Sequence, residues 1–171
     1  AVEWQLAPEN PAIGHWVNVL LYVLTAWLLF RFLVNLFKDD WLFAFVTTLI
    51  YVIHPIHTEV VANIKSRDEI LCFLFLILSF NSFLNLLDKA KPVYALGVLF
   101  YFILSLLSKE SSVTAIIIFP LIAYFFRQHT VGSSIKLSWS PAIAIVVYLS
   151  LRFVVLKGIS NFNEILPINN S

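Results

Sequence analysis

Long apolar runs separated by short polar connections dominate the hydrophobic pattern of this chain. A helix needs about 20 residues to cross a hydrocarbon core of about 30 Å, so runs of this kind predict membrane-spanning helices. We expect an all-α, polytopic helical membrane protein with about six transmembrane helices. The expected spans cover residues 12–37, 41–53, 70–87, 92–107, 113–126 and 141–156.

Prolines and polar segments set the limits of these spans. The run 41–53 is short for a full crossing and ends before Pro55, which biases the preceding residue away from helix. Pro120 lies inside the fifth run and is expected to kink it, because proline donates no backbone hydrogen bond. Loop-like segments are expected at residues 1–11, 128–138 and 157–171.

One further helix is expected to lie along the membrane surface. Between residues 58 and 67, apolar positions fall opposite polar positions that are four residues apart. The apolar side chains are Val60, Val61 and Ile64, and the polar ones are Glu59, Asn63 and Arg67. This pattern is typical of a short amphipathic helix at the interface.

Composition supports the membrane class and narrows the partners. The chain is 60% hydrophobic, 16% aromatic and 12% charged, and its mean hydropathy of +0.89 is far above that of soluble domains. A net charge of +1 without a basic run argues against nucleic acid as a partner, so the lipid bilayer is the expected one. The single cysteine, Cys72, lies in an apolar run and supports neither a disulfide nor a cysteine-based metal site.

We expect residues 1–171 to form a single membrane domain. The chain contains no methionine and begins at Ala1, which favours a piece of a longer protein. Removal of a signal peptide would also leave a small residue in first position.

Six crossings assign each connection to one side of the membrane. Six basic residues then fall on one side and five on the other, and this weak bias indicates that the side of Lys89 is cytoplasmic. Both termini and the two most unusual polar connections, residues 54–69 and 108–112, are then extracytoplasmic.

The densest run of ionisable residues is HPIHTEVVANIKSRDE, residues 54–69. Within it His54, His57 and Glu59 form an H-x-x-H-x-E group that could bind a divalent metal ion, although Pro55 breaks the helix that would align both imidazoles. The alternative is a wet interfacial loop whose side chains hydrogen-bond locally. No other cofactor is indicated.

Residues 66–69 precede the third apolar run with the pattern Ser-x-x-Glu. Ser66 and Glu69 are expected to form a capping box, in which each side chain satisfies a free backbone N–H at the helix start. A functional role is the alternative for Glu69. A helix cap explains the presence of Arg67 and Asp68 in this segment less fully.

The connection SKESS, residues 108–112, is so short that Lys109 and Glu110 must lie close to the membrane. It is either a hairpin tip that holds ordinary charges in water or part of an anion site. In the second case, the N-termini of the third and fifth spans would combine with Arg67 and Lys109 to bind the phosphate of a membrane lipid.

These segments, taken in order, resemble a known family. HPIHTEVVANIKSRDEILCFLF, preceded by NPAIGHWVNVLLYVLTAWLLFR and followed by LLSKESSVT, resembles the membrane domain of the transmembrane and tetratricopeptide-repeat O-mannosyltransferases and their bacterial relatives, in the GT-C superfamily. The resemblance implies a glycosyltransferase that moves a mannose-like sugar from a polyprenyl- or dolichyl-phosphate carrier to a protein hydroxyl or glycan acceptor, with inversion at the anomeric carbon. It implies an active face outside the cytoplasm, in a bacterial inner membrane or the endoplasmic reticulum.

The resemblance also implies roles for the polar residues. Four are expected to bind the carrier phosphate or the sugar: His54, His57, Arg67 and Lys109. Four carboxylates are expected to support catalysis: Glu59, Asp68, Glu69 and Glu110. The family's catalytic base would lie in a loop before Ala1 and its helical repeats after the last span, so the sequence does not predict activity of this piece alone.

Two functions from other classes stay open. A transporter or channel predicts charges deep inside the spans, whereas the charges here cluster at loop edges on one face. A purely structural membrane subunit predicts that alanine at these charges leaves function intact. The position of the charges favours chemistry at the membrane surface.

Overall fold

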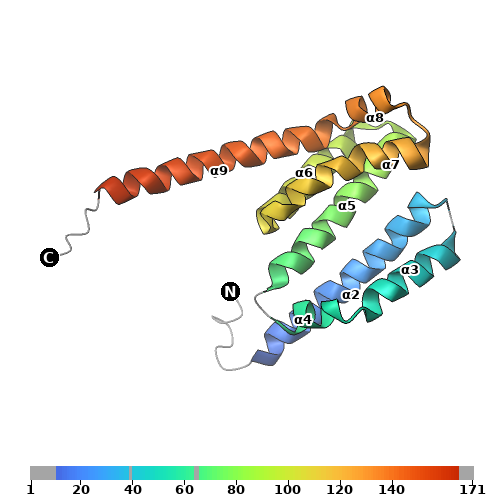
Figure 1. Cartoon of the computed structure of the whole chain (residues 1–171), viewed down its shortest axis with the longest axis horizontal. Helices are drawn as coiled ribbons and strands as arrows, with labels where there is room; N and C mark the ends of the chain where they lie inside the picture. Colours follow the sequence, from blue (N-terminus) through green and yellow to red (C-terminus); the bar gives the residue numbers. More distant parts are fainter. Residues whose placement is uncertain (1–10, 39, 64–65, 166–171) are drawn as a thin grey trace.

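The computed structural model describes residues 11–38, 40–63 and 66–165 (Figure 1). In chain order its elements are α2 (Pro11–Leu36), α3 (Trp41–Ile53), α4 (Ile56–Ala62), α5 (Arg67–Lys89), α6 (Pro92–Ser108), η2 (Glu110–Ile117), α7 (Ile118–Arg127), α8 (Val131–Leu137) and α9 (Trp139–Ile165). Each of these elements is a helix, which confirms the all-α prediction for the described part of the chain.

Four helical segments in the described residues are long and apolar enough to cross a membrane. They are Ile13–Leu36 in α2, Arg67–Lys89 in α5, Glu110–Arg127 in η2 and α7, and Trp139–Lys157 in α9. The apolar helices α3 and α6 occupy the two other predicted spans but are shorter. A polytopic helical membrane protein is therefore confirmed, with four rather than six segments reaching the length of a full crossing.

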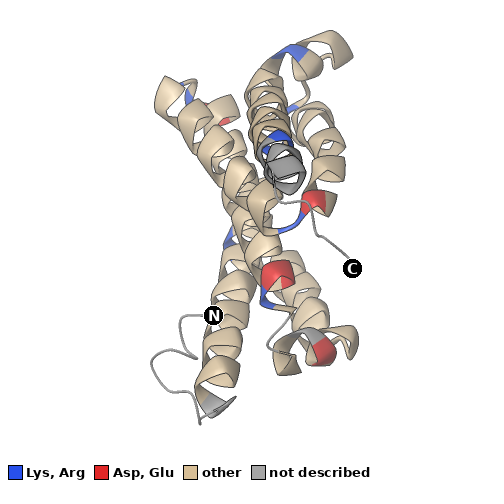
Figure 2. Cartoon of the chain, turned by 90° about the vertical axis from the view of Figure 1, so that its left-hand side faces the viewer, with Lys and Arg blue, Asp and Glu red and all other residues tan. Residues whose placement is uncertain are grey.

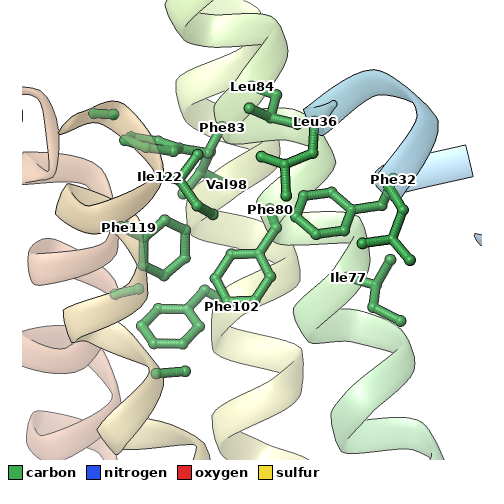
Figure 3. Packing of buried hydrophobic residues seen from close by; sticks show 14 of the residues in the cluster. Phe32, Leu36, Ile77, Phe80, Phe83, Leu84, Val98, Phe102, Phe119 and Ile122 are labelled. Carbon is green, nitrogen blue, oxygen red and sulfur yellow. The ribbon is translucent and has the colours of Figure 1, made fainter. Parts of the chain in front are cut away.

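The centre of the bundle is α5, which packs along α6 and α2. Phe119 of α7 lies in a cluster of aromatic rings, with its centroid 4.9 Å from that of Phe80 and 5.2 Å from those of Phe83 and Phe102 (Figure 3). All three pairs meet edge to face, an arrangement that the ring quadrupoles favour. Because lipid tails are as apolar as these side chains, close packing is what holds such helices together.

Small residues let α5 and α6 approach closely. A Cβ atom added to Gly97 would lie 3.0 Å from the Ser82 Oγ atom, so a larger residue would force a shift. The Ser105 hydroxyl donates to the Cys72 carbonyl (2.9 Å), and the Ser79 hydroxyl donates to a carbonyl of α6 (3.1 Å). These bonds satisfy buried hydroxyls and tie the two helices together.

The fifth predicted span contains a change of helix type. It consists of the 3₁₀ helix η2 followed by α7, and Pro120 lies in the first turn of α7. Proline is tolerated in a first turn because its missing N–H would have no partner there. The change of helix type therefore lies at the start of α7.

Two predicted loops are wrong over most of their length, because residues 131–137 and the described part of the tail, residues 157–165, are helical. Residues 128–138 contain α8, whose N-terminus is capped by the Thr130 hydroxyl accepting from the Ser133 N–H (3.4 Å). The expected tail is helical as far as Ile165, and the C-terminal half of α9 extends away from the other helices (Figure 1). The predicted loop at residues 1–11 lies outside the described residues except for Pro11, which begins α2.

Candidate functional site

A sharp turn separates α3 from α4. His54 has an extended backbone (φ −66°, ψ 125°), the conformation that a following proline favours. Its Nδ1 atom accepts a hydrogen bond from the Ile56 N–H (3.3 Å), so the exposed imidazole stabilises the turn. After the turn, α4 packs beside the N-terminal part of α2 (Figure 1).

Asn18 of α2 is fully buried and joins three segments. Its Nδ2 group donates to the carbonyls of Val61 and Asn63 (3.3 Å each), at the end of α4. Its Oδ1 atom accepts from Arg67 Nε (2.8 Å), and Arg67 Nη2 donates to the Gly14 carbonyl (3.2 Å). Unpaired polar groups are costly inside a protein, so this network fixes the start of α5 against α2.

The structure corrects the single amphipathic helix predicted for residues 58–67. The helix α4 ends at Ala62, Asn63 has an extended backbone (φ −93°, ψ 115°), and Arg67 begins α5. Arg67 therefore does not share a helix face with Glu59. Ile64, one of the expected apolar anchors, lies outside the described residues.

His57 of α4 lies against two tyrosine rings. Its ring centroid is 4.3 Å from that of Tyr51 and 5.8 Å from that of Tyr22. Burial lowers the pKa of His57 because it removes water from the imidazolium form, and the nearby His54 lowers it further by charge repulsion. The neutral form, which can donate one hydrogen bond and accept another, is therefore favoured at neutral pH.

Two hollows share His57 and Tyr22 in their lining. One has a volume of about 230 Å³ and is lined by Tyr22, Tyr51, His57, Glu69, Ile70 and Phe73. The other, of about 440 Å³, lies between α2 and α4 and includes His15. The first hollow brings an imidazole and a carboxylate from separate helices to one apolar pocket, an arrangement typical of ligand sites.

Lys109 reaches this pocket through an ion pair. Its Nζ atom lies 2.6 Å from Glu69 Oε1, and the two side chains are 38% and 45% exposed. The hydrogen bond to Glu69 and the negative charge of that carboxylate raise the pKa of Lys109, against a smaller opposing effect of burial. Lys109 is thus a stable cation that incoming anions can still contact.

The predicted capping box is wrong. Ser66 is the N-cap of α5 but its side chain makes no capping hydrogen bond. The Glu69 carboxylate instead pairs with Lys109, because the turn between α6 and η2 brings an ammonium group within reach. The alternative reading of Glu69 as a residue of the polar site fits this placement.

Glu110 lies apart from the pocket, although it follows Lys109 directly. Its carboxylate pairs with Arg152 of α9, whose Nη1 group also donates to the Tyr148 hydroxyl (3.1 Å). Charged residues occupy only a few short stretches of the helices (Figure 2). This pair therefore connects η2 to α9 rather than adding a carboxylate to the pocket.

The other predicted residues do not assemble into a metal site. Glu59 and Asp68 are exposed and form no ion pair within the described residues. The ring centroids of His54 and His57 are 6.0 Å apart. Across residues 11–38, 40–63 and 66–165, no three His, Cys, Asp or Glu residues are grouped to hold a metal ion.

Comparison with known sequences decides the family. Residues 5–156 match the family described as dolichyl-phosphate-mannose-protein mannosyltransferase, which covers most of the chain. The chain belongs to this family. The resemblance inferred from the ordered motifs is confirmed.

Named relatives of this mannosyltransferase-family chain are similar over parts of its length. Mouse (Mus musculus) protein O-mannosyl-transferase TMTC1 is 37% identical over 120 residues, which are 64% of this chain and 13% of that protein. Mouse TMTC2 is 41% identical over 70 residues, which are 41% of this chain and 8% of that protein. Protein O-mannosyl-transferase F38B6.6 of Caenorhabditis elegans is 33% identical over 112 residues, covering 63% of this chain and 15% of that protein. The chain spans a small part of these relatives, and no solved structure matches it.

Several residues of the site in this family member escaped the sequence reasoning. They are Asn18, Tyr22 and Tyr51. A signal was present for two of them, because Asn18 and Tyr22 are four residues apart and so share one face of an otherwise apolar helix. Tyr51 had no such signal, since only the folded chain shows what it contacts.

Proposed function

We propose that the protein transfers a mannose-like sugar from a polyprenyl- or dolichyl-phosphate carrier to a hydroxyl of a protein or glycan acceptor. The observation that supports this proposal is the pocket of His57 and Glu69 with Lys109 beside it, in a chain of a mannosyltransferase family. The proposed active face is extracytoplasmic, in a bacterial inner membrane or the endoplasmic reticulum. The enzyme would be of the GT-C type.

The chemistry requires a cation where the carrier leaves. As the acceptor oxygen bonds to the anomeric carbon, the bond from that carbon to the phosphate oxygen breaks, and negative charge grows on the phosphate. Lys109 is the proposed contact, because its ammonium is exposed enough to exchange part of its bond with Glu69 for one to phosphate. Arg67 is the second proposed cation at this end of α5, held in place by Asn18.

The carboxylates and imidazoles have supporting roles in this proposal. Glu69 positions Lys109, and Glu110 holds η2 in place through its pair with Arg152. The exposed carboxylates of Glu59 and Asp68 orient the acceptor, in support of the base that the family resemblance places in an earlier loop. In this proposal His57, favoured in its neutral form, hydrogen-bonds the sugar from inside the pocket, and the ring of His54 lies 6.0 Å from that of His57.

Sugar transfer by the full-length protein tests the role of Lys109. In proteoliposomes supplied with dolichyl-phosphate-mannose and an acceptor peptide, Lys109→Ala should lower kcat/KM by about 100-fold, the effect of losing one charged contact to a transition state. Lys91→Ala is the matched control, because Lys91 is exposed at the opposite end of the bundle. Full activity of Lys109→Ala, with the control also active, would overturn the phosphate assignment.

A further inference from the structure

A second polar groove lies between α2 and α5, at the end of the bundle opposite the candidate site. It has a volume of about 660 Å³, and its polar lining comes from Arg31, Asn35, Asn81 and Asn85. Asn81 precedes Lys89, the last residue of α5, by eight positions, which is about 12 Å along a helix. The groove therefore reaches from the predicted cytoplasmic surface toward the hydrocarbon core.

Three of the four polar side chains in this groove make no hydrogen bond or ion pair within the described residues. Arg31 is exposed, its guanidinium carbon lies 5.2 Å from the centroid of the Trp27 ring, and it forms no ion pair there. The side-chain amides of Asn35 and Asn81 make no hydrogen bond in the same residues, whereas Asn85 Nδ2 donates to the Asn81 carbonyl (2.9 Å). A cation and free amides at this depth are costly unless a ligand pairs with them.

An apolar groove continues from the polar one. It has a volume of about 380 Å³, lies between α2 and α3, and shares Trp27 and Phe30 with the polar groove. Its other lining residues are apolar except Thr48, whose hydroxyl already donates to the Ala44 carbonyl (2.8 Å). A polar groove therefore adjoins an apolar groove, and this arrangement suits an amphiphilic ligand.

We propose that these two grooves together bind one anionic phospholipid. The headgroup phosphate lies against Arg31 and accepts hydrogen bonds from the amides of Asn35 and Asn81, and one acyl chain follows the apolar groove past Phe30. Basic pockets between helices on the cytoplasmic side are known to suit anionic headgroups. Lys38 and Lys89 are exposed at the same end and add to the attraction.

The polar lining distinguishes this ligand from a further helix. A helix packed on the grooves would fill the apolar part but would bring no negative charge to Arg31 unless it carried an acid at that depth. A free phosphate ion would satisfy Arg31 but would leave the groove beside Phe30 empty. An anionic lipid satisfies both parts.

Native mass spectrometry of the full-length protein in detergent tests the proposal. Phosphatidylglycerol should bind as one retained molecule, at least about tenfold more tightly than phosphatidylcholine, because only the anionic headgroup carries a net charge to pair with Arg31. Arg31→Gln should weaken phosphatidylglycerol binding about tenfold, and Arg31→Lys should keep most of it. Lys91→Gln, which removes an exposed cation outside the groove, should leave binding unchanged.

Each contrary result overturns a defined part of the proposal. Equal losses in Arg31→Gln and Lys91→Gln would mean that general surface charge attracts the lipid. Equal binding of inorganic phosphate and phosphatidylglycerol would remove the acyl chain from the proposal. Asn81→Leu is a second variant, which leaves the charge of Arg31 in place. If Asn81→Leu and Arg31→Gln, measured separately, both bound the lipid normally, the groove would have to be covered by protein instead.

Discussion

The two ends of the α2–α5 pair carry similar side chains in different states. At the α4 end, Asn18 is buried and bonded to two carbonyls and to Arg67. At the Lys89 end, the amides of Asn35 and Asn81 make no hydrogen bond within the described residues. The same chemical group is thus part of the fold at one end and available to a ligand at the other.

The cations differ in the same way. Lys109 is held by Glu69 at the edge of a pocket, whereas Arg31 lies over the Trp27 ring without an acid in the described part of the chain. A cation with a fixed protein partner has a defined position, which a reaction requires. A cation without one can take its partner from the membrane, so the difference between the ends agrees with the two proposals, a reacting site at one end and a lipid site at the other.

Replacing one asparagine at each end gives the largest expected contrast. Asn18→Leu should lower the free energy of unfolding by about 3 kcal/mol, because it leaves two carbonyls and the Arg67 guanidinium without their bonds. Asn81→Leu should lower it by less than about 1 kcal/mol, because no protein hydrogen bond of its amide is lost. Denaturant titration of the full-length protein in mixed micelles measures both.

The matched substitutions also sharpen the comparison of function. Asn18→Leu should reduce sugar transfer, since Arg67 and the end of α4 lose their support. Asn81→Leu should leave transfer in lipid-saturated micelles near that of the parent protein. Equal destabilisation by the two substitutions would contradict the difference between the ends.

A smaller contrast concerns two of the ion pairs, one at each end of α5. Arg127 binds Asp88 through two bonds, Nε to Oδ1 (2.6 Å) and Nη2 to Oδ2 (2.9 Å), and its side chain is only 11% exposed. Asp88→Asn should therefore lower the free energy of unfolding by about 1.5 kcal/mol. Glu69→Gln should lower it by less than about 1 kcal/mol, because its pair with Lys109 is largely solvated.

Double-mutant cycles with Arg127→Gln and Lys109→Gln measure the two coupling energies. If the pair of Glu69 and Lys109 proved the stronger, it would have to be regarded as part of the scaffold. The expected result leaves Lys109 free to exchange partners during a reaction. A stronger coupling between Arg127 and Asp88 would also show that the Lys89 end holds a tight ion pair beside the open groove.

The fold was predictable where the cause is local. Run length and apolarity place the spans, and Pro120 marks the change of helix type, because both act on neighbouring residues. The helix α8 and the extension of α9 were missed, because their serine, glycine and asparagine content resembles that of a loop. The low helix propensity of these residues was outweighed in α9 by the long apolar helix that they extend, and in α8 by the cap at its N-terminus.

The site was predictable by residue type but not by pairing. His57, Glu69 and Lys109 were expected to be functional residues, and the structure brings them to one edge. The predicted pairing of Glu69 with the N-terminus of its own helix was wrong. The sequence shows that Ser66 is nearby, but it does not show that a distant turn brings the ammonium group of Lys109 close. A sequence pattern indicates hydrogen-bond partners that are close along the chain, whereas a partner from a distant segment is seen only once the helices have packed.

The smallest expected effect concerns the protonation of His57. Because its pKa in the folded protein lies below the ordinary 6.5, the unfolded chain binds more protons at acid pH than the folded chain does. Its contribution to stability is therefore complete above about pH 6.5 and is lost as the pH falls through the folded pKa. NMR titration of histidine-labelled full-length protein in micelles should show the His57 signal titrating below pH 6.5.

Two variants complete this measurement. His54→Gln should raise the pKa of His57 by removing one repelling charge, and His57→Gln identifies the His57 resonance. A His57 pKa at or above 6.5 would contradict the half-buried position against Tyr51 and Tyr22, on which its proposed hydrogen bond to the sugar depends.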